Sequence, residues 1–195
     1  MIWFTSDHHF LHDRVAGYCG RPKEHECLML YGLKDIQSTD HVYFLGDILF
    51  RLRRPRAHSA LNTIVPPASK KIFVEGNHDR GTKARTWHGW DERVKYKRHL
   101  IHEIDRITVA MSHRPQDLRE VDAQIYIHGH LHDIGPKWRW EGDKLWVNVC
   151  VEQWDYKPVP WDNIRSVWQL NTPTPVEGQD EESPEQQHEK RRKTR

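Results

Sequence analysis

The segment Lys71-Ile-Phe-Val-Glu-Gly-Asn-His-Asp79 joins a short apolar run to four residues that can turn the chain and bind ligands. Such a run, bounded by glycine and asparagine, is typical of a buried strand. Asn77 offers a neutral oxygen ligand, and His78 beside it could protonate a leaving group as a general acid. Asp79 could accept a hydrogen bond from His78 and so fix its tautomer. This is the most specific stretch of the chain.

The same arrangement, a strand-like run followed by Asp, Asn or His, recurs along the chain. The other motifs are Asp7-His8-His9 after residues 2–5, Gly46-Asp47 after 41–45, Ser112-His113 after 106–111, and Gly129-His130-Leu131-His132 after 124–127. Polar ligands at several strand ends, far apart in sequence, are how a sheet gathers a metal site at one edge. The pattern therefore predicts a metal centre built from distant segments.

The spacing within the motifs predicts which side chains face the ions. Residues i and i+2 of an extended segment point the same way, so Asp7 and His9 are expected to face one ion, with His8 turned away. The pair His130 and His132 repeats this spacing. The carboxylate of Asp47 can bridge two cations, which lie roughly 3.5–4 Å apart in two-metal sites.

Each motif has a plainer reading when it is taken alone. An aspartate after glycine often caps a helix or a turn, and a single histidine such as His113 is often structural. Gly46 would let the chain turn sharply and pass close to the site. The order and context of the five motifs together favour the metal centre.

The bulk composition is that of one domain with a buried core, within 195 residues. A formal net charge of +2 is too small to indicate nucleic-acid binding by itself. Three cysteines without a CxxC pair disfavour disulfides and fit a reducing compartment. No apolar run reaches the roughly 18 residues of a membrane span, and Met1–Thr5 leads into a motif instead of forming a signal peptide. We expect a cytoplasmic protein with no membrane partner.

The remaining segments are expected to complete one domain over residues 1–170. Apolar residues in helical period predict a helix over 23–37, and Pro55 favours a helix over 55–64. Strands are expected within 94–104 and over 145–151 and 164–170, whereas glycines argue against a helix near Gly17. Residues 171–195 are poor in apolar residues and rich in charge, which predicts a disordered tail, either solubilising or weakly bound to a polyanion.

The ordered set of motifs over residues 1–151 resembles the calcineurin-like metallophosphoesterase superfamily. The opening is similar to a bacterial and phage branch, through His9-Phe10-Leu11-His12 and the later Arg21-Pro22, although Leu11 stands where that branch has glycine. The resemblance implies an α/β fold, a four-layer αββα sandwich of two mixed sheets flanked by helices. It also implies two groups of metal ligands. They are Asp7, His9, Asp47 and His132 for one ion and Asp47, Asn77, His113 and His130 for the other.

The function implied is hydrolysis of a phosphoester by a hydroxide that bridges two divalent cations, with His78 as general acid. Mixed oxygen and nitrogen ligands suit Mn, Fe, Zn or Ni, and we favour Mn. Arg80, Arg114 and His12 are expected to contact the substrate. We expect a phosphodiester, either a cyclic nucleotide or a small nucleic acid, in a bacterial or phage-infected cell.

Three alternatives to the diesterase stay open at this point. One is a phosphomonoesterase or protein phosphatase, and another is a scaffold of the same fold without catalysis. The third is a nucleic-acid-binding protein that uses the arginines of 51–56 and the tail. The sequence leaves the oligomeric state open.

Overall fold

The computed structural model describes residues 1–50, 54–81 and 83–171. The predicted tail lies outside the described residues from 172 onward, as do residues 51–53 of the arginine-rich segment 51–56. No helix in the described part of the chain is long and apolar enough to cross a bilayer.

The first sheet is mixed and has five strands in the order β10-β1-β2-β3-β4. Its strands are β1 (Ile2–Thr5), β2 (His41–Phe44), β3 (Lys70–Val74), β4 (Glu92–Val94) and β10 (Val159–Pro160). The first four run parallel, and β10 pairs antiparallel with β1. The carboxyl ends of four strands therefore meet at one edge.

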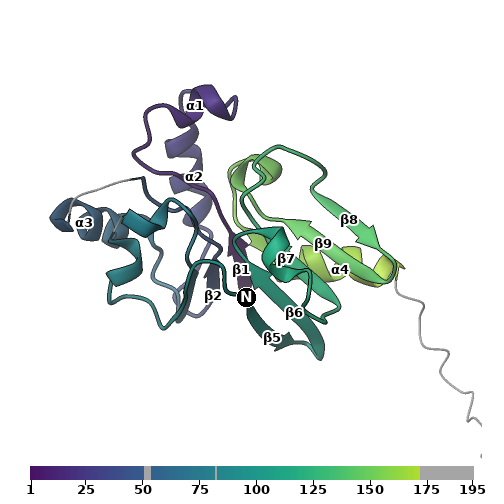
Figure 1. Cartoon of the computed structure of the whole chain (residues 1–195). Coiled ribbons are helices and arrows are strands. Elements are labelled where there is room, and N and C mark those ends of the chain that lie inside the picture. Colours follow the sequence, from purple (N-terminus) through teal and green to yellow (C-terminus); the bar gives the residue numbers. More distant parts are fainter. Residues whose placement is uncertain (51–53, 82, 172–195) are drawn as a thin grey trace, which may run out of the picture.

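The second sheet is also mixed, with the order β5-β6-β7-β9-β8. Its strands are β5 (Leu100–Ile104), β6 (Ile107–Ser112), β7 (Ile125–His128), β8 (Trp138–Glu141) and β9 (Lys144–Asn148). The three central strands β6, β7 and β9 run parallel, while β5 and β8 are antiparallel edges. Figure 1 shows this sheet in the green part of the ribbon, beside the purple and teal part that holds the first.

The main core lies between the two sheets, because each contributes one apolar face to it. It includes Phe4, Tyr43 and Ile72 from the first sheet and Val109, Met111, Ile127 and Leu145 from the second. Phe4 stacks on Tyr43 with ring centroids 5.0 Å apart. Two sheets that share one core are held in a fixed relation, and this positions the loops at their common edge.

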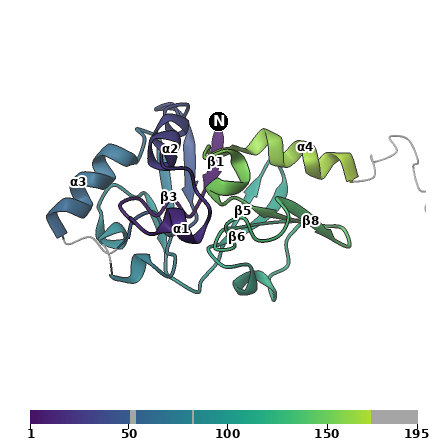
Figure 2. The same ribbon diagram turned by 90° about the horizontal axis from the view of Figure 1, so that it is seen from above.

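The helices are α1 (Val15–Tyr18), α2 (His25–Leu33), α3 (Arg54–Ile64) and α4 (Trp161–Asn171). Single 3₁₀ turns occur at η1 (Asp79–Gly81), η2 (Ala84–Thr86), η3 (Pro115–Leu118) and η4 (Val151–Trp154). α2 and α3 cover the outer face of the first sheet, and α3 and α4 lie at opposite ends of the molecule (Figure 2). The predicted fold class, α/β with two mixed sheets and flanking helices, is confirmed.

The outer face of the second sheet has a thinner cover than the first. Ala110, Tyr126 and Trp146 pack there against Leu118 of η3 and Ala123. This outer layer therefore consists of a 3₁₀ turn and the loop that follows it.

Two local predictions were wrong and a third was confirmed. Residues 164–170 form part of α4, because Trp161, Ile164 and Trp168 repeat at helical spacing and meet the core between the sheets. The strand expected within 94–104 is confirmed as β5, which a turn with Lys97 at φ +62° separates from the end of β4. The short helix α1 forms despite its glycine.

Candidate metal centre

The donor residues come from loops at the edge where the parallel strands of both sheets end. The loops after β1, β2 and β3 carry Asp7 and His9, Asp47, and Asn77, while those after β6 and β7 carry His113, His130 and His132. Backbone hydrogen bonds connect these loops, from Asp7 N to Gly46 O at 3.0 Å and from Ser6 N to Val149 O at 3.1 Å. The second bond joins the two sheets beside the site.

The backbone at the donors is left-handed rather than extended. Five donors have positive φ: Asp7 +59°, His9 +50°, Asp47 +53°, His130 +72° and His132 +51°. The prediction that alternation along an extended chain aligns each i, i+2 pair was therefore wrong in its geometry, although the side chains do converge. Non-glycine residues hold this conformation at an energetic cost, which is characteristic of functional sites.

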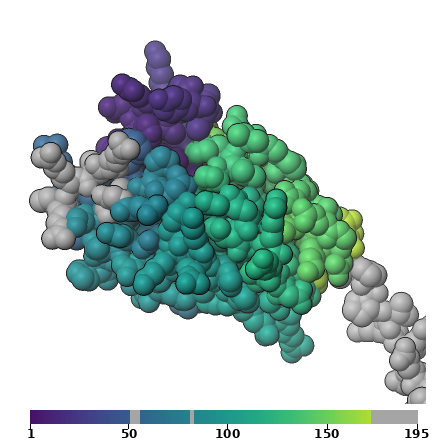
Figure 3. Space-filling model, in the orientation of Figure 1, coloured from purple at the N-terminus to yellow at the C-terminus, as the bar shows by residue number. Residues whose placement is uncertain are grey.

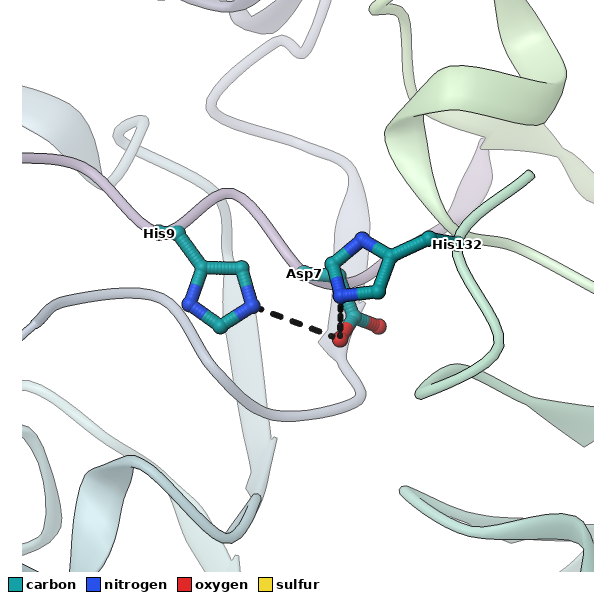
Figure 4. Close-up of side chains that lie close together, drawn as sticks. All are labelled: Asp7, His9 and His132. Atoms are coloured by element: carbon teal, nitrogen blue, oxygen red, sulfur yellow. Dashed lines mark ion pairs between the residues drawn. The ribbon is translucent and has the colours of Figure 1, made fainter. Parts of the chain in front are cut away.

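A first donor group surrounds Oδ1 of Asp7. His9 Nε2 and His132 Nε2 each lie 3.7 Å from this oxygen, and Figure 4 shows both rings directed at the one carboxylate. His132 Nδ1 donates a hydrogen bond of 2.8 Å to Glu152 Oε1. Because Nδ1 carries the proton, Nε2 of the neutral ring presents a lone pair to the site.

A second donor group surrounds Oδ2 of Asp47. This oxygen lies 3.5 Å from His113 Nε2 and 3.7 Å from His9 Nε2. His113 Nδ1 donates to the carbonyl of Leu45 at 2.8 Å, and its Nε2 lies 3.0 Å from Asn77 Oδ1. Oδ2 of Asp47 therefore lies between the donors of both groups, as a bridging ligand would.

His130 closes the set on the second sheet's side. Its ring centroid is 5.0 Å from that of His113, and its backbone N–H donates a hydrogen bond of 2.8 Å to Asp7 Oδ2. The structure thus gathers all seven residues that the sequence predicted as ligands. Their assignment to particular ions stays a prediction.

The charges of the buried donors fit a cation between them. Asp7 and Asp47 are 0% and 1% exposed, and Asp7 Oδ1 has no hydrogen-bond partner in the described structure. Burial alone would raise the pKa of Asp7, but His113, His9 and His132 together lower it well below its usual value. Burial, followed by the charge of Asp7, raises the pKa of Asp47 to about 8. Divalent cations would offset the repulsion between these carboxylates.

The sequence profile of the calcineurin-like phosphoesterase superfamily domain matches residues 1–151, a span that contains every donor motif. The chain belongs to the calcineurin-like phosphoesterase superfamily. The resemblance that the motifs indicated is thereby confirmed. Membership implies divalent metal ions and hydrolysis of phosphoesters, and the donor groups described above agree with both.

Known relatives cover most of the chain. An uncharacterised protein of Methanocaldococcus jannaschii is 32% identical over 177 residues, which span 84% of this chain and 88% of that protein. The crystal structure of a protein of unknown function from Aquifex aeolicus has a TM-score of 0.65 and 26% identity, over 86% of this chain and 98% of that one. An archaeal phosphodiesterase is more distant, with a TM-score of 0.47 and 18% identity over 75% of this chain and 81% of that one.

A buried layer behind the donors includes residues to which sequence reasoning gave no role. Arg21 donates to the carbonyls of Asp7 and His8 at 2.5 and 2.6 Å, and its Nε donates to Glu152 Oε1 at 2.8 Å. Glu152 in turn accepts from His132. In the sequence, the Arg21-Pro22 pair is only a mark of the superfamily branch. Nothing in the sequence around Glu152 indicates a role.

Cys150 is a further member of this buried layer. Its thiol donates to Asp7 Oδ2 at 3.2 Å, and its sulfur accepts from His132 N at 3.2 Å. Together with the His130 N–H, the thiol occupies Oδ2 of Asp7 and leaves Oδ1 to face the imidazoles.

Asp79 joins two of the donor loops. Its Oδ2 accepts hydrogen bonds from Asp47 N at 2.6 Å and Gly76 N at 2.9 Å. Burial, with a further contribution from the charge of Asp47, raises the pKa of Asp79 to about 7. The structure thus shows a positioning contact, while the expected hydrogen bond to His78 stays a prediction.

Gly46 has the close approach that the sequence predicted. Its φ is +93°, and a Cβ placed on it would lie 2.6 Å from His113 Nδ1 and 2.7 Å from Gly76 Cα. Leu11 holds a similar left-handed conformation with φ +65°, which explains why glycine suits that position.

A cleft of about 640 Å³ opens over the first donor group. Its lining includes His9, His78 and His132 together with His12, Phe50 and Tyr18. His12 stacks on Phe50 with centroids 3.6 Å apart, which places His12 in the cleft. Figure 3 shows the purple N-terminal segment, to which α1 belongs, standing out from the body.

The two predicted substrate arginines lie against Tyr96. The guanidinium carbons of Arg80 and Arg114 lie 5.4 and 5.8 Å from the ring centroid of Tyr96, and Arg114 Nη1 donates to the Tyr96 hydroxyl at 2.9 Å. Their contact with substrate stays a prediction.

Proposed function

We propose that the protein is a phosphodiesterase that works with two divalent cations shared by Asp47. The observation that supports this most directly is the position of Asp47 Oδ2, within 3.5 Å of His113 and 3.7 Å of His9, between the two donor groups. The other oxygen, Oδ1, accepts a hydrogen bond of 2.8 Å from His78 N. The carboxylate is thereby held with one oxygen aimed between the groups.

The residues that would hold the ions fall into two groups about Asp47. One group would be completed by Asp7, His9 and His132. The other would be completed by Asn77, His113 and His130. Bound divalent cations would neutralise phosphate charge and lower the pKa of a coordinated water. Mn is the metal that we favour among Mn, Fe, Zn and Ni.

In this proposal His78 protonates the leaving oxygen. Its side chain is exposed at the cleft, and its ring centroid lies 5.1 Å from that of His9. A general acid must reach the substrate from outside the ligand set. Its place next to Asn77 and its backbone hydrogen bond to Asp47 Oδ1 keep its main chain beside the donor loops.

The substrate class is tested by comparing a diester with a monoester. Purified protein is treated with a chelator, reloaded with Mn, Fe, Zn or Ni, and assayed with bis-p-nitrophenyl phosphate and p-nitrophenyl phosphate. We expect metal-dependent hydrolysis that favours the diester. Preference for the monoester would instead indicate a phosphomonoesterase or protein phosphatase.

The Asp47→Ala variant tests the bridging role. We expect it to lose metal-dependent hydrolysis while its circular dichroism spectrum stays that of the parent. Full activity in this variant would remove the proposed bridge. A parent protein that binds metal and hydrolyses neither ester would be a scaffold.

A further inference from the structure

A second pocket lies beside the metal centre and is not used by the chemistry above. Its volume is about 520 Å³. It is bounded by the end of β4, the residues after it and the turns η1 and η2. The lining residues are Glu75, Arg80, Arg85, Thr86, Arg93, Lys95, Tyr96 and Lys97.

The charge of this basic pocket is far from balanced. Five cationic side chains face it with one carboxylate, in a protein whose formal net charge is only +2. Glu75 is buried and lies 3.9 Å from Arg93 Nε. In the described part of the chain, no carboxylate lies within 4 Å of the charged groups of Arg85 or Lys95. Such a hollow concentrates positive potential and attracts anions.

The basic pocket is joined to the metal centre through Tyr96 and Arg80. Arg80 directly follows Asp79, which binds the Asp47 loop. The Tyr96 hydroxyl accepts from Arg114, the residue after the donor His113. A substrate whose reacting phosphate lies at the donors therefore has a cationic hollow next to it for another anionic group.

The cleft that His78 lines has a different character from the basic pocket. His12, Phe50 and Tyr18 line it with rings, and Tyr18 is 73% exposed. Planar bases stack on such side chains in proteins that bind single strands. The chain therefore offers rings in the cleft that contains His9 and His132 and cations in the basic pocket next to the Asp79 and His113 loops, which suits the bases and phosphates of a polynucleotide.

We infer that the basic pocket is a subsite for a second phosphate, and that the substrate is a short single-stranded oligonucleotide. This inference rests on the proposed phosphodiesterase function. One phosphodiester lies at the donors, the next phosphate in the basic pocket, and a base against the rings of the cleft.

The test compares charge removal in the basic pocket with the same change elsewhere. The variant Arg85→Gln/Lys95→Gln removes two exposed cations of the pocket. The control Arg106→Gln/Lys144→Gln also removes two cations. Arg106 directly precedes β6 and Lys144 begins β9, so both lie at the strand ends opposite to those that carry the donors. Initial rates are measured on the metal-loaded proteins with hexathymidylate and with bis-p-nitrophenyl phosphate, which has one phosphate.

We expect the pocket variant to raise KM for hexathymidylate by about tenfold and to leave the KM for bis-p-nitrophenyl phosphate unchanged. The slope of log KM against log salt should fall by about 0.7 for each phosphate that the variant no longer neutralises. The control should change neither value. An unchanged KM for the oligonucleotide in the pocket variant, or an equal rise in the control, would overturn the subsite.

A binding experiment separates failure of the subsite from failure of the proposed function. Fluorescence anisotropy of labelled hexathymidylate on the same proteins needs no turnover. If no metal supports hydrolysis of either substrate, the proposed function fails, while binding that is abolished only in the pocket variant still supports the subsite. Absence of oligonucleotide binding to the parent protein overturns the subsite. Inorganic tripolyphosphate is then added as a competitor at equal phosphate concentration. If it displaces the labelled hexathymidylate as well as the unlabelled oligonucleotide does, the assignment to a nucleotide is overturned.

Discussion

The conformation of single residues explains much of the donor arrangement. Asp7 and Asp47 both have left-handed backbones and are almost completely buried. Each uses one oxygen for hydrogen bonds to the protein, to His130 N and to His78 N respectively. The other oxygen of each faces imidazole nitrogens. The cost of this backbone geometry and of two buried carboxylates is offset when cations bind.

The His78→Ala variant tests the role of that ring. Its backbone N–H, which binds Asp47 Oδ1, is kept, so the donors should stay in place. We expect metal affinity like that of the parent and a kcat for the diester lower by about 10²–10⁴-fold, the usual contribution of a general acid. Steady-state kinetics and isothermal titration calorimetry with Mn measure the two quantities. An unchanged kcat would assign the acid to another group.

His128 gives a prediction about acid sensitivity. Burial, the main cause, lowers its pKa to about 4 from an ordinary value near 6.5. Between these pH values the unfolded chain binds the proton and the folded protein does not, so stability falls as the pH drops from 6.5 to 4. One such histidine contributes a slope of at most about 1.4 kcal/mol per pH unit.

We therefore expect His128→Gln to lose less stability than the parent between pH 6.5 and 4. Urea unfolding of chelator-treated protein across this range gives the slope. The control is His99→Gln, because His99 is exposed. Equal slopes for the His128 variant and the parent would contradict the prediction.

At the scale of elements, the segment between α1 and α2 supports the donor loops through Arg21. That guanidinium holds the backbone of the loop after β1, and through Glu152 in η4 it is connected to the His132 ring. Two segments that lie far apart in the sequence thus orient one imidazole. Contacts of this kind set the direction and basicity of a metal ligand.

The Glu152→Gln variant tests this support. A glutamine keeps the size of the side chain but removes the charge that holds the His132 Nδ1 proton. We expect metal affinity to fall by about 10–100-fold, measured by titration calorimetry. Glu141→Gln is the control, since Glu141 lies at the end of β8. Equal affinities in parent and Glu152 variant would show that the contact does not position His132.

The sequence was informative where a strand leads into a motif. The runs before Asp7, Asp47, Asn77 and His113 are strands within one or two residues of their predicted bounds. It was less informative where only tertiary packing decides, as in α4, whose apolar residues fit a strand until the core is known. Arg21 and Glu152 meet across 131 positions. No local pattern could pair them.

At the scale of the whole molecule, the donor set belongs to both sheets. Asn77 follows β3 of the first sheet and His130 follows β7 of the second. The two sheets share one apolar core and meet at the edge through the hydrogen bond between Ser6 and Val149. Cations bound by donors from both sheets would connect the sheets at this edge. The apolar core connects them between their faces.

Metal binding should therefore stabilise the whole fold rather than one half. A cation at a hundredfold excess over its Kd adds about 2.7 kcal/mol to the stability, which corresponds to a rise in Tm of roughly 5–10 °C for a domain of this size. We expect the Mn-induced rise, measured by scanning calorimetry, to be reduced both in Asn77→Ala and in His130→Ala. Lys144→Gln, at the opposite edge, should keep the full rise. If one donor variant kept the full rise while the other showed none, the ions would be held by a single sheet, and the shared centre would have to be abandoned.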